Sequence, residues 1–166
     1  MVATSPSASA SATPQIGDLY AHWIDGRRVR PDGSPDLVRT NPASSSDVLG
    51  GLRSADLDLV RTAVRSAAAA WPTWRNTPAP TRGHVLLEAA RLMDKHRAEL
   101  AGLVALEEGK ALKDARAEVQ RSINITEFMG GEGRRYGGYT SGSESATKFA
   151  FTTRQPLGVV ACITPW

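Results

Sequence analysis

The residues best suited to chemistry lie at the end of the chain, between Pro156 and Trp166. The run from Val159 to Ile163 is apolar and rich in β-branched side chains, and Pro165 prevents its continuation. We therefore predict a buried parallel strand that ends in a sharp loop. Ligands in open α/β sheets bind just beyond the carboxyl ends of such strands, where freed main-chain groups and an indole ring could hold a ribose or an adenine. The candidate binding residues are Ile163, Thr164, Pro165 and Trp166.

Two glycine-containing segments look like phosphate loops but lack the required context. Residues 131–137 have the spacing of a dinucleotide loop, but that chemistry needs a strand before the glycines, and here a helix is expected before them. The segment Glu107-Glu108-Gly109-Lys110 is followed by Ala111, where a phosphate loop needs Ser or Thr to hold magnesium. We expect a helix-ending loop at the first segment. At the second we favour a salt bridge near a helix end over a place in a substrate tunnel.

The sequence offers no metal site and no evident nucleophile. His22, His84 and His96 lack metal-ligand spacing. Cys162 is the single cysteine, which excludes an intramolecular disulfide and a cysteine-based zinc site. A reactive thiolate needs a basic neighbour or a helix N-terminus, whereas Cys162 falls inside the apolar run, so we interpret it as inert packing. No catalytic residue is assigned.

The bulk composition is that of an ordinary globular protein. The 166 residues are 41% hydrophobic and 22% charged, with a net charge of +3. The charges are interspersed, which argues against a nucleic-acid partner. Residues 1–16 are rich in Ala, Ser, Thr and Pro and predict a disordered tail without the regions of a secretory signal. No apolar stretch is long enough to span a bilayer. We expect a cytoplasmic protein without a membrane partner.

The elements expected first are a hairpin, a strand and a helix. Asp25-Gly26 supplies the positive φ angles of a tight turn and predicts a β-hairpin over residues 19–30. Asn41-Pro42 opens a loop before a short strand over residues 48–52. Ser54 is expected to cap a first helix that Pro72 ends, with Trp71 and Trp74 packing between helices.

Two further helices and two strands are expected after these. The second helix should begin at Thr81 and stop at Gly109. The third should span residues 113–129, and its inner face would consist of Ala115, Val119, Ile123 and Thr126. Residues 149–154 alternate as a strand, and the last strand is left without a sheet to join.

The terminal segment resembles the motif P-x-G-V-x-x-x-I-x-P-W-N of the aldehyde dehydrogenase superfamily, here from Pro156 to Trp166. Asn41-Pro42, the E-x-G-K match at residues 107–110 and the stretch 128–136 support the resemblance. It implies that residues 163–166 line a nicotinamide-dinucleotide site for NAD or NADP. It also implies an α/β fold, with residues 17–166 as the N-terminal portion of a Rossmann-type dinucleotide-binding domain. That portion would contain a β-hairpin, helices and the first parallel strand, and would be truncated at its C-terminal end.

The resemblance further implies a parent enzyme that oxidises an aldehyde to a carboxylic acid through a cysteine thiohemiacetal, with hydride passing to NAD(P)⁺. Residues 136–140 and 154–158 are similar to those of semialdehyde-oxidising members, including the succinate and 2-oxoglutarate types. The family's catalytic Cys and Glu would lie beyond Trp166, so the chain alone is expected to be inactive and to expose its last strand. The full parent is expected to be a homodimer or homotetramer.

Two alternatives remain open. A CoA-acylating aldehyde dehydrogenase would pass the acyl group to CoA instead of water. A non-enzymatic helical interaction module would add its last strand to the sheet edge of a partner protein.

Overall fold

The computed structural model describes residues 20–165, so the predicted tail over residues 1–16 and Trp166 lie outside the described residues. Residues 20–165 contain ten elements, which form three two-stranded antiparallel sheets and four helices. They are β1 (His22–Ile24), β2 (Arg27–Val29), β3 (Leu37–Asn41), β4 (Ser44–Leu52), α2 (Leu57–Asn76), α3 (Ala79–Lys95), α4 (Arg97–Glu108), α5 (Leu112–Glu132), β5 (Thr140–Ser141) and β6 (Ala150–Phe151).

The first hairpin, β1–β2, confirms the turn predicted at Asp25-Gly26. Both residues have positive φ, 53° and 69°, as a two-residue hairpin turn requires. The second hairpin, β3–β4, was only half predicted, because its first strand was missed. All of β3 except Asn41 is exposed, so no buried face imposes the alternation by which a strand is recognised. At the tip, the Asn41 side-chain oxygen accepts a hydrogen bond from the Ala43 N–H at 3.0 Å.

Helix α2 differs from its prediction at both ends. Asp56, not Ser54, is the N-cap, and its carboxylate accepts from the Leu59 N–H at 2.8 Å. The helix also continues through Pro72 to Asn76. Proline at that position leaves the carbonyl of Ala68 without its helical donor, but Ala68 is exposed and water can supply the missing bond.

The single long helix predicted between residues 81 and 109 is two helices. α3 begins at Ala79, with Pro80 in its first turn, and not at Thr81. The chain breaks at His96, whose φ of −102° and ψ of 17° leave the helical region, and α4 begins at once. The predicted stop at Gly109 is confirmed: its φ is 73° and its N–H donates to the Ala105 carbonyl at 2.9 Å.

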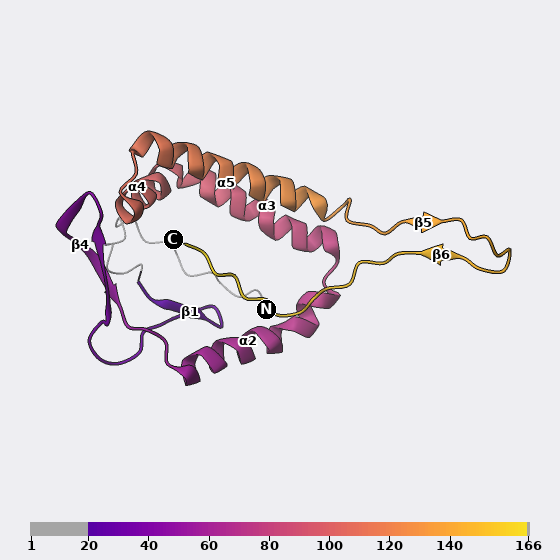
Figure 1. The fold of residues 1–166 in the computed structure, drawn as a ribbon, viewed down its shortest axis with the longest axis horizontal. Coiled ribbons are helices and arrows are strands. Elements are labelled where there is room, and N and C mark those ends of the chain that lie inside the picture. The colour runs from indigo at the N-terminus through magenta and orange to yellow at the C-terminus, as the bar shows by residue number, and fades with distance from the viewer. Residues whose placement is uncertain (1–19, 166) are drawn as a thin grey trace, which may run out of the picture.

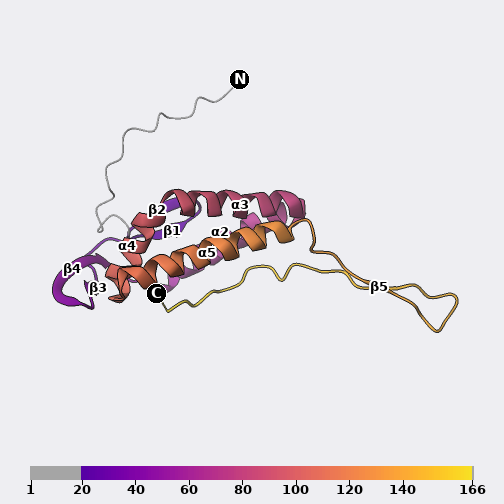
Figure 2. The ribbon, with the colours of Figure 1, turned by 90° about the horizontal axis from the view of Figure 1, so that it is seen from above.

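The core lies where α3, α4 and α5 meet, and the predicted inner face of α5 forms much of it. The buried residues there are Ala90, Ala101, Ala115, Val119 and Ile123. Thr126, the fourth predicted member, is only half-buried and donates to the Ser122 carbonyl at 2.8 Å. Figures 1 and 2 show α3 and α5 side by side, with α4 across one end. By contrast, α2 contains no buried residue.

The predicted C-terminal strands are largely unformed. Only Ala150–Phe151 of the range 149–154 pairs, with β5, and this narrow hairpin projects away from the helices in Figures 1 and 2. The predicted buried parallel strand over residues 159–163 is wrong for this structure, because the segment is exposed and belongs to no sheet. A parallel strand needs a neighbour, and none of the three described sheets provides one. The α/β class holds, as four helices with small sheets.

Candidate functional site

The predicted cofactor-binding residues lie on an exposed, extended segment. Ile163 is 98% exposed, and Thr164 and Pro165 are exposed beside it. The chain reaches them by running back from β6 along the helices towards the end of the molecule that holds β3 and β4 (Figures 1 and 2). Within residues 20–165, the main-chain N–H and C=O groups of Ile163 and Thr164 make no backbone hydrogen bond. Trp166 lies outside the described residues.

Cys162 lies on the same segment and is exposed, so the expectation that it is buried packing is wrong for this structure. The reason is the missing sheet: the side chains predicted to be buried by neighbouring strands face solvent here. Leu157, at 94% exposure, shows the same effect at the start of the segment. Exposure alone does not make a thiol a nucleophile, since a reactive thiolate also needs a basic neighbour. In the described structure no basic side chain is hydrogen-bonded to Cys162.

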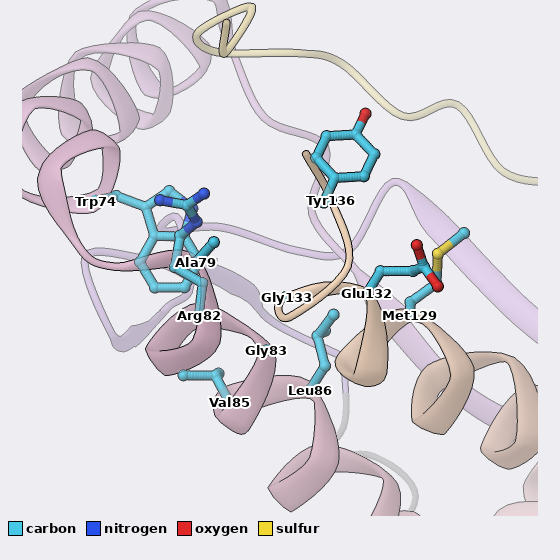
Figure 3. Close-up of a pocket in the computed structure, with 10 residues that line it drawn as sticks. All are labelled: Trp74, Ala79, Arg82, Gly83, Val85, Leu86, Met129, Glu132, Gly133 and Tyr136. Atoms are coloured by element: carbon cyan, nitrogen blue, oxygen red, sulfur yellow. The ribbon is translucent and has the colours of Figure 1, made fainter. Parts of the chain in front are cut away.

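A mainly apolar pocket of about 270 Å³ lies between the α2–α3 junction and the end of α5. In Figure 3, Trp74 and Arg82 stand on one side, with Met129, Glu132 and Tyr136 on the other. The remaining lining residues are Ala79, Gly83, Val85, Leu86 and Gly133. Trp74 was expected to pack between helices, but it is 47% exposed and forms part of this wall.

Glycines bring the two sides of the pocket together. A Cβ at Gly133 would stand 2.5 Å from the Ala79 carbonyl oxygen, and a Cβ at Gly83 would stand closer than 3.0 Å to the Gly130 carbonyl oxygen. Real Cβ atoms essentially never approach so closely. The helices α3 and α5 can therefore meet in this way only because these positions carry no side chain. Of the glycines in the phosphate-loop-like segment 131–137, Gly133 is thus a helix-packing residue.

The polar groups of the pocket are already engaged by the chain. Arg82 donates to the carbonyls of Thr77 at 2.5 Å and Arg75 at 3.4 Å, so it caps the end of α2. Glu132 pairs with Arg135 at 2.6 Å. The guanidinium of Arg154 lies 4.3 Å from the centre of the Tyr136 ring, on the hairpin side. What remains available in the pocket is apolar surface, which could hold an apolar group but perform no bond-breaking chemistry.

The glutamates near the end of α4 form ion pairs, which confirms the salt-bridge prediction. Glu107 accepts from Arg39 of β3, with the Arg39 Nη2 at 3.0 Å, and also from the Tyr20 hydroxyl. Burial, followed by the hydrogen bond to Glu107 and its negative charge, raises the pKa of Tyr20 to about 12. This cluster ties the hairpins to the helices.

The neighbouring lysine forms a second ion cluster at the α4–α5 corner. Lys110 pairs with Glu108 at 2.5 Å and with Glu118 of α5. The hydrogen bonds that Lys110 donates to these two carboxylates, first to Glu108 and then to Glu118, raise its pKa. The E-x-G-K segment thus closes the turn between the helices: Gly109 supplies the left-handed backbone and Lys110 joins the two ends.

The described residues hold no group of three or more His, Cys, Asp or Glu placed to bind a metal ion. None of the helices described is long and apolar enough to cross a membrane. Sequence reasoning missed the pocket between α2, α3 and α5, because its two walls come from residues more than forty positions apart in the chain. The one available signal was the set of glycines at 83, 130 and 133, which only the helix pairing makes meaningful.

Comparison with known proteins supports the resemblance drawn from the sequence. The profile of the Aldehyde dehydrogenase family matches residues 29–166. The chain is 41% identical over 148 residues to a 2,5-dioxopentanoate dehydrogenase of Saccharolobus solfataricus, covering 89% of the chain and 30% of the relative. It is 38% identical over 143 residues to an NADP⁺ succinate-semialdehyde dehydrogenase of Escherichia coli, covering 86% of the chain and 30% of the relative.

Solved structures agree in fold. The crystal structure of an aldehyde dehydrogenase from Brucella melitensis matches with a TM-score of 0.79 and 25% identity, over 90% of this chain and 30% of that one. The chain thus spans about 30% of the length of the curated relatives it matches. The profile match covers most of the chain, and it includes the terminal motif from which the resemblance was drawn. On these grounds the chain belongs to the aldehyde dehydrogenase family.

Proposed function

We propose that this chain forms the opening part of an NAD(P)-dependent dehydrogenase that oxidises an acid semialdehyde to a dicarboxylic acid. The observation that carries the proposal is the family match over residues 29–166 together with the two relatives above. Both relatives are named for substrates that carry a carboxylate at one end and an aldehyde at the other. Identities of 41% and 38% over nearly the whole chain support a shared substrate class.

Ile163, Thr164, Pro165 and Trp166 are proposed to hold the nicotinamide cofactor. The fit rests on the free main-chain groups of Ile163 and Thr164 and on the exposed Ile163 side chain, which a ligand could cover. The bound nicotinamide would supply the hydride acceptor. This chain's own part is to position the cofactor at the end of the segment, while the nucleophile comes from elsewhere in the parent protein. Cys162 precedes the proposed cofactor contacts by one residue and is not assigned that role.

The activity is tested on the parent protein that carries this sequence. Formation of NADH or NADPH is followed with succinic semialdehyde, 2,5-dioxopentanoate and the neutral aldehyde butanal. We expect oxidation of both acid semialdehydes with a lower KM than for butanal, and no requirement for CoA. A parent that turns over no aldehyde contradicts the proposal. A strict requirement for CoA would assign it to the CoA-acylating alternative.

The cofactor contacts are tested by a matched pair of substitutions on the exposed segment. Ile163→Asp should raise the KM for NAD⁺ or NADP⁺ about tenfold, because it replaces an apolar contact by a charge that repels the cofactor phosphates. Leu157→Asp, at a similarly exposed position six residues earlier, is the control. Equal effects of the two substitutions would contradict the assignment of Ile163. The proposal also includes a homodimer or homotetramer in the cytoplasm, for which light scattering and cell fractionation are the checks.

A further inference from the structure

The two arms of the β5–β6 hairpin meet at its base, close to the turn that follows α5. The Thr152 N–H donates to the Tyr139 carbonyl at 2.8 Å, and the Tyr139 N–H donates to the Thr152 hydroxyl oxygen at 3.0 Å. Gly138 permits this approach, because a Cβ there would stand closer than 3.0 Å to the Thr152 carbonyl oxygen. The returning arm is therefore held against the outgoing arm as far as Thr152.

Arg154, two residues further along, joins the returning arm to the helices. Its Nε donates to the Gly137 carbonyl and its Nη1 to the Tyr136 hydroxyl, both at 3.3 Å. The guanidinium also lies 4.3 Å from the centre of the Tyr136 ring. Both partners belong to the turn after α5, in which the Tyr136 N–H donates to the Glu132 carbonyl at 2.9 Å. Arg154 thus anchors the returning arm to the end of α5.

Beyond Arg154 the chain has no further polar anchor on the described helices. Among residues 20–165, residues 155–165 make no hydrogen bond or ion pair. Gln155 is restricted to extended conformations because Pro156 follows it, and the proline ring fixes its own φ. Two further residues separate Pro156 from the apolar run that begins at Val159. The anchor at Arg154 therefore sets where the run that leads to Ile163 begins.

We propose that Arg154 is a positioning residue for the bound nicotinamide cofactor, acting through the short stretch of chain between it and the contacts at residues 163–166. This inference rests on the proposed function. By fixing the start of the segment to the turn after α5, Arg154 reduces the conformational freedom that the segment loses when the cofactor binds. A guanidinium suits this role, because it stacks on the Tyr136 ring and donates hydrogen bonds in its own plane, which an ammonium group does not.

The first test measures cofactor binding and needs no turnover. The parent protein is titrated in a calorimeter with NAD⁺ and, separately, with NADP⁺. Arg154→Met should raise the Kd of the cofactor that binds about fivefold, since an exposed cation–π contact and two hydrogen bonds are lost. Arg154→Lys should recover part of the affinity, because an ammonium group can still lie over the Tyr136 ring. An unchanged Kd in Arg154→Met would overturn the proposal.

Arg135→Met is the matched control. Arg135 precedes Tyr136, pairs with Glu132 at 2.6 Å and lies 5.8 Å from the centre of the Phe128 ring. It therefore makes the same kinds of contact as Arg154, but only within α5 and its turn. Arg135→Met should leave the Kd of the cofactor unchanged, and a rise equal to that of Arg154→Met would overturn the proposal.

A double-substitution cycle tests whether Arg154 acts through Tyr136. Tyr136→Leu should weaken cofactor binding by a similar factor, because it removes both the ring and the hydroxyl that hold Arg154. The combined variant should bind the cofactor no more weakly than Arg154→Met alone, since both changes break one contact. Fully additive losses would show that the two residues act separately and would overturn the proposal.

A purely structural role of Arg154 predicts a different result. Arg154→Met would then lower the Tm of the parent but leave the Kd of the folded protein unchanged, which would overturn the proposal. In turnover, positioning predicts a raised KM for the cofactor with the KM for succinic semialdehyde unchanged. A parent that oxidises no aldehyde but binds NAD⁺ or NADP⁺ with a Kd that depends on Arg154 would refute the proposed function and keep this inference. A parent that binds neither cofactor would overturn both.

Discussion

Gly83 sits in α3 where that helix crosses α5, and replacing it by alanine should destabilise the protein. The added methyl carbon would stand closer than 3.0 Å to the carbonyl oxygen of Gly130. That oxygen belongs to the backbone of α5, so it cannot swing away as the end of a long side chain can. The two helices would have to separate, which loosens the contact of Gly83 and Gly133 that also builds the apolar pocket.

Gly102 in α4 provides a matched control for the magnitude. It too lies inside a helix, but a Cβ there meets nothing within 4 Å. In each helix, alanine gains about 1 kcal/mol of helix propensity over glycine, so this contribution is common to both variants. The difference in unfolding free energy between Gly83→Ala and Gly102→Ala is then the steric cost alone, about 1–3 kcal/mol.

The assay is urea unfolding followed by far-ultraviolet circular dichroism at low protein concentration. For a denaturant slope of about 2 kcal/mol per molar, the steric cost places the urea midpoint of Gly83→Ala about 1 M below that of Gly102→Ala. Gly102→Ala itself should lie slightly above the unsubstituted chain. If Gly83→Ala unfolds at the same urea concentration as Gly102→Ala, the close approach of α3 and α5 is refuted.

Three further predictions concern the core, a helix cap and pH. Ile123→Ala should lower the unfolding free energy by about 2–4 kcal/mol, because Ile123 is 3% exposed. Ile125 lies on the same helix but is half-exposed, so Ile125→Ala should lower the unfolding free energy far less. Equal losses of the two variants in urea unfolding would contradict this prediction. Asp56→Ala should lower the unfolding free energy by about 1 kcal/mol, and Asp56→Asn should lower it much less, since Asn also caps helices. A thermal melt in which both variants unfold at the same temperature as the unsubstituted chain would contradict the role of Asp56 as the cap. The raised pKa of Tyr20 means that its neutral form stabilises the fold fully below about pH 10, the usual pKa of tyrosine, and that this stability is lost as the pH rises through about 12. The Tyr20→Phe variant should lack that part of the alkaline loss, and identical pH profiles of unfolding would show that the hydroxyl is not coupled to Glu107.

Local sequence signals predicted the parts of the fold that depend on local chemistry. The hairpin at Asp25-Gly26 and the helix end at Gly109 were predicted correctly, because both depend only on positive φ angles that these residue types adopt readily. The apolar stripe of α5 was recognised because Ala115, Val119 and Ile123 repeat at the helical period. The signals failed where two residues compete for one role, as Ser54 and Asp56 do for the cap of α2. They also failed at Pro72, where solvent compensates for the bond that proline removes.

For the candidate sites too, some features could be predicted from the sequence and others only from the tertiary structure. Sequence alone determined the family, because the terminal motif is a run of adjacent residues that needs no folding to be read. Tertiary structure decided everything that depends on residues distant in the chain. The close glycine contact and the pocket beside it each join the end of α5 to residues that precede it in the chain by more than forty positions. It also decided the state of the Val159–Ile163 segment, whose strand-forming residues remain exposed because a strand forms only against a neighbour.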